Sequence, residues 1–217
     1  MRLASLLPCL AALAALGHTR GDIIPAPPMA TARMAHTATT LRDGRVLVAG
    51  GFAGVSQAAV SAELYDPAAN RFLALPRMLA PRHSHTATLL RDGRVLLAGG
   101  YAADGTTASA EVYDPVTRRF VATGAMRAAR AGHIAAVLEN GKVLLVGGVG
   151  PDWTFLSSAE LFDPVTGQFT TTGAMSVARE SHAAVRLIDG RVLIIGGHRG
   201  RRADITLYAS AEAYDPR

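Results

Sequence analysis

Residues 82–100 read RHSHTATLLRDGRVLLAGG and contain the pattern that decides the fold. Residues 85–90, which read HTATLL, lead into Asp92 and Gly93. This pair suits a two-residue type I′ hairpin because both residues tolerate positive φ. The apolar run at residues 95–97 follows and does not alternate with polar residues, so we expect a strand that is buried on both faces. Such a strand requires sheets stacked against each other.

The same pattern recurs four times from Met29 onward with a period of 48 to 49 residues, which is the signature of a repeat architecture. Each copy has an arginine three residues before a histidine, then a hairpin glycine, a diglycine, and a glutamate two residues before an aromatic residue. We expect positive φ at all four hairpin glycines, which are Gly44, Gly93, Gly141 and Gly190. The repeated polar residues are Arg33, Arg82, Arg130 and Arg179, His36, His85, His133 and His182, and Glu63, Glu111, Glu160 and Glu212.

Each repeat is predicted to form four antiparallel strands, with small residues in the first strand and aromatic residues in the third and fourth. One such sheet cannot bury two apolar faces by itself, so the copies should pack face to face around an axis, as the blades of a propeller do. The sequence therefore predicts an all-β protein with four countable blades. Their bounds are residues 29–77, 78–125, 126–174 and 175–217.

The repeats resemble those of the kelch family. The resemblance rests on the diglycine, the aromatic residue after the glutamate, and a second aromatic residue seven positions later, as in the pairs Tyr65 with Phe72, Tyr113 with Phe120, and Phe162 with Phe169. Phenylalanine stands where kelch repeats usually have tryptophan. The resemblance covers residues 29–217 and implies a kelch-type β-propeller of the galactose-oxidase-like superfamily, of the kind found in secreted bacterial proteins. It leaves function open, because kelch propellers include oxidases, sugar mutarotases and protein-binding adaptors.

Known kelch propellers usually have about six or seven blades, so four blades leave the closure of the ring open. In one alternative, residues 18–28 supply the outer strand of the fourth blade and close a small ring, with Ile23 at the position of Phe72. In the second alternative the propeller is incomplete. In the third, a half-ring forms a homodimer.

Residues 1–17 have the features of a secretory signal peptide: Arg2, an apolar run at 3–16, and small residues that place cleavage near Gly17. We therefore expect a secreted or periplasmic protein. The run is too short to span a bilayer and no later segment is a candidate, so no membrane span is predicted. Cys9, the only cysteine, lies within the run. Pro8 and the short apolar stretch before Cys9 argue against a lipoprotein anchor there.

The composition is that of a globular domain, with 49% apolar and 18% charged residues among 217. The net charge is +5, and Lys142 is the only lysine among 22 basic residues. Arginine suits carboxylates and other planar anions. Because the arginines recur at intervals and form no basic run or helix, we expect no nucleic-acid partner.

The sequence gives little support for an enzyme. A copper-radical oxidase is disfavoured because its tyrosine is crosslinked to a cysteine, and Cys9 would leave with the signal peptide. We predict no cofactor and no metal, since histidines that recur in every blade suit a structural hydrogen bond better than a metal site. The repeated arginines either pair with the glutamates or form an anion-binding clamp on one rim. The alternative function is that of a mutarotase acting on acidic sugars, with Glu180 and His83 as the catalytic pair.

The loops between the second and third strands vary most and should open onto the same rim as the arginines. They hold the other candidates for ligand binding, which are Tyr101, Trp153, Phe155, Arg199, Arg201 and Arg202. Aromatic faces and guanidinium groups suit a sugar or an acidic peptide. The sequence therefore predicts a binding module that recognises a carbohydrate or protein ligand on its loop rim.

Overall fold

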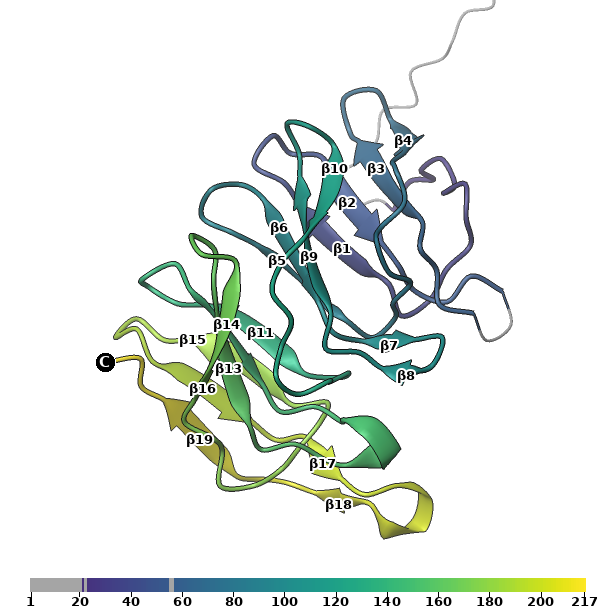
Figure 1. Ribbon diagram of the computed structural model, residues 1–217. Coiled ribbons are helices and arrows are strands. Elements are labelled where there is room, and N and C mark those ends of the chain that lie inside the picture. Colours follow the sequence, from purple (N-terminus) through teal and green to yellow (C-terminus); the bar gives the residue numbers. More distant parts are fainter. Residues whose placement is uncertain (1–20, 22, 55–56) are drawn as a thin grey trace, which may run out of the picture.

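The computed structural model describes residues 21, 23–54 and 57–217, which form four antiparallel sheets, one from each repeat (Figure 1). The first sheet contains β1 (Thr37–Thr40), β2 (Val46–Ala49), β3 (Ala62–Asp66) and β4 (Arg71–Ala74). The second contains β5 (Thr86–Leu89), β6 (Val95–Ala98), β9 (Ala110–Asp114) and β10 (Arg119–Ala122). The third contains β11 (Ile134–Val137), β12 (Val143–Val146), β13 (Ala159–Asp163) and β14 (Gln168–Thr172). The fourth has three strands, β15 (Ala183–Arg186), β16 (Val192–Ile195) and β19 (Ala211–Tyr214).

The connections between second and third strands carry small elements of their own. They are the hairpin β7 (Tyr101–Ala102) with β8 (Gly105–Thr106), the hairpin β17 (His198–Arg199) with β18 (Thr206–Leu207), and the 3-10 helices η1 (Pro151–Trp153) and η2 (Arg202–Asp204). In Figure 1 the labelled strands of both hairpins lie on one side of the molecule, away from the turns that join β5 to β6 and β15 to β16. This side is the loop rim. On the opposite rim the four hairpin glycines have φ between 83° and 91°, as predicted. The predicted type I′ turn is wrong, however, because the residue before each glycine, such as Asp92, does not have positive φ. Gly93 N–H donates to the carbonyl oxygen of Leu90 and Leu90 N–H donates to that of Arg94, so the loop has three residues.

The sheets pack face to face, as the unbroken apolar runs predicted. The middle strands β6 and β12 are buried along their whole length. The first two interfaces join leucines of one blade to the aromatic pair of the next, as where Leu47 and Leu64 share a cluster with Tyr113 and Phe120. The inner strands follow one another around the axis, with β1 beside β5, β5 beside β11 and β11 beside β15. This is the arrangement of propeller blades.

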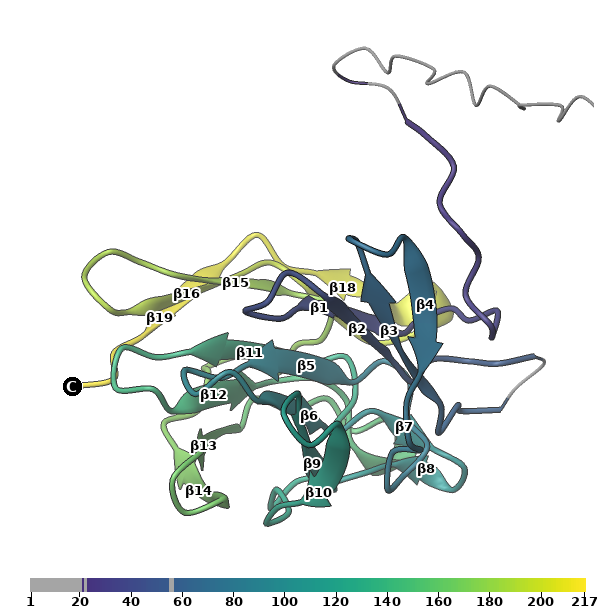
Figure 2. The same ribbon diagram turned by 90° about the horizontal axis from the view of Figure 1, so that it is seen from above.

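The blades form an open arc. Within the described residues, β15 makes no contact with β1 comparable to those between successive blades, and Figure 1 shows the first and fourth sheets at opposite ends of the series. Residues 23–28 form no strand, Ile23 is fully exposed, and Figure 2 shows this segment extending away from the sheets. The alternative of a small ring closed by residues 18–28 is therefore corrected. The segment precedes the first blade, and the fourth blade lies at the other end of the arc.

The predicted signal peptide, residues 1–17, lies outside the described residues, as do residues 18–20. In the part of the chain that is described, no helix has the length and apolar character needed to cross a membrane.

Candidate functional site

Each of the four repeated arginines forms an ion pair with the glutamate of its own blade. The arginine side chains are at most 1% exposed. The N–O distances are 2.7 Å for Arg33 with Glu63, 2.9 Å for Arg82 with Glu111, 2.9 Å for Arg130 with Glu160, and 3.0 Å for Arg179 with Glu212. The interpretation of these arginines as an anion clamp is therefore corrected: their guanidinium groups point into the blades and cannot reach a ligand on the rim.

The third blade shows what this pair does. Arg130 Nη1 donates to the carbonyl oxygens of Gly147 at 2.9 Å and Ser158 at 3.0 Å, while Nη2 donates to Glu160. Glu160 also accepts the backbone N–H groups of Arg127 and Ala128. Burial lowers the pKa of Arg130, and the bond to Glu160 opposes that shift. The pair thus links residues 127–130, which precede β11, to the backbone beside β12 and β13.

The repeated histidines join neighbouring blades. His85 Nε2 lies 3.0 Å from the Thr37 hydroxyl, and His133 Nε2 lies 2.9 Å from that of Thr86. Burial lowers the pKa of His85 and His133 to about 3, so both rings are neutral at pH 7. Two histidines thus fill the structural role that the sequence suggested. Across the described ranges, no group of three or more His, Cys, Asp or Glu side chains is placed to hold a metal ion.

The variable residues after each arginine meet the residues after each diglycine. Backbone bridges pair Met34 with Phe52, His83 with Tyr101, Ala131 with Val149, and Glu180 with His198. One such pair lies at the loop rim of every blade. These positions carry different residues in each blade, whereas the buried arginine–glutamate pairs are the same in all four. The rim therefore presents different side chains on each blade.

A row of aromatic rings crosses the first three blades at this rim. Phe52 lies 3.6 Å from His83, His83 stacks on Tyr101 at 5.0 Å, and Tyr101 lies 5.8 Å from Trp153, all between ring centroids. The Arg201 guanidinium of the fourth blade lies 3.0 Å from the Trp153 ring centroid. The structure thus brings together the predicted residues Tyr101, Trp153 and Arg201. Phe52 was not among the expected residues, although it follows its diglycine as Tyr101 does.

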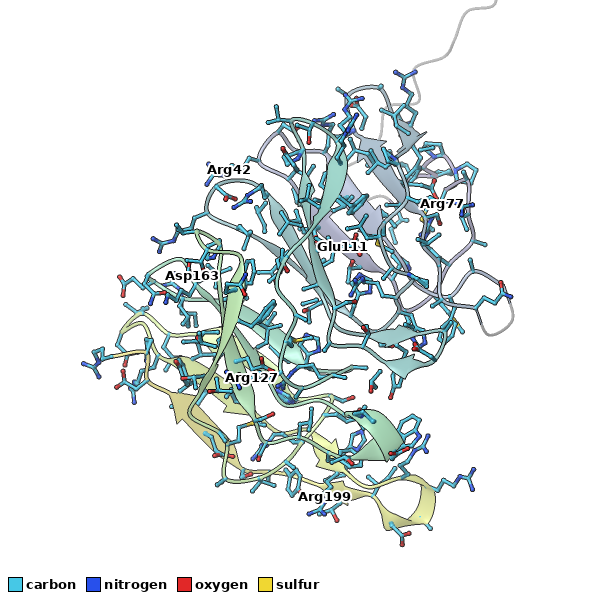
Figure 3. All side chains as sticks on the ribbon, viewed as in Figure 1. Arg42, Arg77, Glu111, Arg127, Asp163 and Arg199 are labelled. Atoms are coloured by element: carbon cyan, nitrogen blue, oxygen red, sulfur yellow. The ribbon has the colours of Figure 1, made fainter. Side chains whose placement is uncertain are left out.

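The remaining candidates lie on the same rim but not in the row. Phe155 packs edge-on against His198 at 6.1 Å, and His198 Nε2 lies 3.4 Å from Glu180 Oε1. Within the described residues no hydrogen bond joins Glu180 to His83, the pair of the mutarotase alternative. Arg199 and Arg202 are exposed on the loop of the fourth blade, where Figure 3 labels Arg199.

A groove of about 290 Å³ lies between the loop of the second blade and that of the third. Tyr101 and Trp153 line it together with Asp104 and Asp152. Thr106 lines it too, and within the described part of the chain its buried hydroxyl group has no hydrogen-bond partner. The groove therefore combines two aromatic rings, two carboxylates and an unsatisfied hydroxyl.

The comparisons with known proteins concern the repeats. Residues 130–176, which include Arg130, His133, Glu160 and the diglycine of the third blade, match the family model of the kelch motif. No curated protein matches the chain. The other blades have the same residues in the same places. The match to one repeat therefore supports placing the chain in the kelch-repeat family.

Proposed function

We propose that this protein is a secreted or periplasmic binding module that holds a carbohydrate in the groove beside Tyr101 and Trp153. The observation that carries the proposal is the combination of groups lining that groove. Sugar rings present apolar C–H faces that pack on aromatic rings, and hydroxyl edges that need hydrogen-bond partners. Asp104 and Asp152 are acceptors for such hydroxyls, and the Thr106 hydroxyl has no hydrogen-bond partner among the described residues.

The charges favour a neutral sugar over an acidic peptide. Asp104 and Asp152 would repel an anion in the groove, and the guanidinium of Arg201 is packed on Trp153. Burial lowers the pKa of His83, so this ring is neutral at pH 7 and adds to the aromatic row without adding a cation. The four buried arginines contribute no charge to the rim.

Trp153 is the only tryptophan, so its fluorescence reports on the groove directly. We would titrate the protein with a panel of neutral oligosaccharides and with acidic peptides, at low and high salt. A neutral oligosaccharide should change the Trp153 emission with an affinity that does not depend on salt, because no charge is neutralised.

Calorimetry then tests the residues. Trp153→Ala should weaken binding at least tenfold and Thr106→Val should weaken it less. Val165→Ala, on a turn at the opposite rim, should leave it unchanged. Binding that is confined to acidic peptides and weakens with salt would overturn the proposal, as would full affinity in Trp153→Ala.

A further inference from the structure

A trough lies along the junction between the second and third blades, on the side of the hairpin turns. It consists of two cavities, of about 370 and 400 Å³, that share Arg94, Pro164 and Val165 in their walls. Arg94 Nη2 donates to the Pro164 carbonyl oxygen at 3.0 Å, and this bond joins the second blade to the third. Both walls belong to described residues, so the shape of the trough does not depend on what flanks the four blades.

One wall of the trough is β10, the outer strand of the second blade (Figure 1). β10 pairs with β9 along one edge, and no strand of the described residues pairs with its other edge. Thr123, just after β10, donates its N–H to the Ala110 carbonyl oxygen at 3.3 Å. By the alternation of an antiparallel pair, the N–H of Ala122 therefore points away from β9. An unpaired strand edge of this kind is a template for another extended segment.

The opposite wall is the turn of the third blade at residues 164–168. Gly124 N–H of the second blade donates to the Gly167 carbonyl oxygen at 2.8 Å, so the two walls are joined there. Val121 and Val165 line the trough and are 58% and 93% exposed. These two side chains thus offer apolar surface that aliphatic side chains of an incoming segment can cover.

The larger cavity also contains a guanidinium group without a carboxylate partner. Arg91 is exposed, and none of the ion pairs among the described residues includes it. Its stem lies over Gly141 of the third blade, where a Cβ would be 3.3 Å from Arg91 Cδ. Arg94, by contrast, is paired with Asp92 at 2.6 Å. Arg91 therefore offers a free cation to the trough, and a guanidinium group suits a carboxylate because it can donate two parallel hydrogen bonds.

We infer that the trough binds an extended segment of a partner protein, at a site separate from the carbohydrate groove on the loop rim. The segment adds to the free edge of β10 as a further strand of the second blade. Its aliphatic side chains pack against Val121 and Val165, and a carboxylate at one end binds Arg91. β10 spans about 13 Å, so the pairing part of the segment has about four residues.

A protein segment is the occupant that the chemistry of the trough favours. A membrane surface or an acidic polysaccharide offers anions to Arg91, but neither brings the row of carbonyl groups that matches a strand edge. The carboxylates of Asp92 and Asp114 also line the trough and would repel a polyanion. A single carboxylate at the Arg91 end satisfies the free cation and leaves the rest of the segment uncharged.

The test compares two short fluorescent peptides of alternating valine and threonine, one ending in glutamate and the other in glutamine, both with an amidated C-terminus. Their binding to the full chain is measured by fluorescence anisotropy at low salt. The glutamate peptide should bind about tenfold more tightly, because only its carboxylate pairs with Arg91. Arg91→Ala should abolish this difference between the peptides, which isolates the pair as a double-mutant cycle does.

Ala122→Pro tests the strand edge. It removes the N–H that points away from β9, and proline is tolerated at such a place, so both peptides should bind about tenfold more weakly. Val121→Asp puts a carboxylate on the apolar wall and should weaken the glutamate peptide more than the glutamine peptide. Arg199→Ala is the matched control, because it removes an exposed arginine that Figure 3 labels at the far end of the molecule from β10. It should bind both peptides as the unmodified chain does.

All four variants change exposed side chains, so circular dichroism should show an unchanged fold. The inference is overturned if neither peptide binds, or if Arg91→Ala keeps the preference for glutamate. It is also overturned if polyglutamate or anionic lipid vesicles bind as tightly as the glutamate peptide, since charge alone would then explain the binding. Self-association of the chain that Ala122→Pro abolishes would show that a second copy fills the trough, in place of a separate partner.

Discussion

Replacing Arg130 with alanine tests whether the repeated arginines hold the blades together. Arg130 is fully buried and its partner Glu160 is 1% exposed. The replacement leaves the Glu160 carboxylate without its guanidinium and removes the donor from the carbonyl groups of Gly147 and Ser158. Removing one partner of a buried ion pair costs about 3 to 5 kcal/mol, because the remaining charge stays buried and uncompensated.

For a domain of this size each kcal/mol lowers Tm by about 2 to 4 °C, so Arg130→Ala should lower it by about 6 to 20 °C. Thermal unfolding followed by circular dichroism measures the change. The matched control is Arg191→Ala, which removes an ion pair of similar length, 2.7 Å, whose side chains are 43% and 49% exposed. Its Tm should stay close to that of the unmodified chain. If both variants melt together, or if Arg130→Ala loses only ligand binding, the structural role of the arginines is wrong.

Three further outcomes are expected. Gly99→Ala should destabilise the fold more than Gly196→Ala when both are compared by urea unfolding. Both glycines have a positive φ, but only at Gly99 would the new methyl group meet the next blade, and equal losses of stability would contradict this. Stability should fall as the pH drops below about 6.5, by about 1.4 kcal/mol per pH unit for each histidine. The unfolded chain then binds protons that His85 and His133, with a pKa of about 3, do not bind in the fold; equal urea midpoints at pH 7 and pH 5 would refute the assignment. Thr86→Val should cost about 1 to 3 kcal/mol because it leaves His133 Nε2 buried without its hydroxyl partner, and an unchanged Tm would show that this bond contributes nothing.

Part of the site could be predicted from the sequence alone. Tyr101, Trp153 and Arg201 were expected at the rim because they lie in the variable loops, and the structure places them in contact. The groove itself could not be predicted. Thr106 and Asp104 reach it only because the short hairpin of β7 and β8 turns toward the loop of the third blade, which depends on how two loops of different length pack.

The sequence by itself determined the strands, the places of the hairpin turns and the kelch-type blades, because these depend on local patterns that four copies repeat: a glycine at each tight turn and an apolar run in each middle strand. Only the tertiary structure decided which face each arginine points to, and so that Arg33, Arg82, Arg130 and Arg179 are buried rather than offered to a ligand. It also decided that the arc stays open. The arc closes only if the small rotations between neighbouring blades add up to a full turn. These rotations depend on contacts between residues about 48 positions apart, so no local sequence pattern predicts their total.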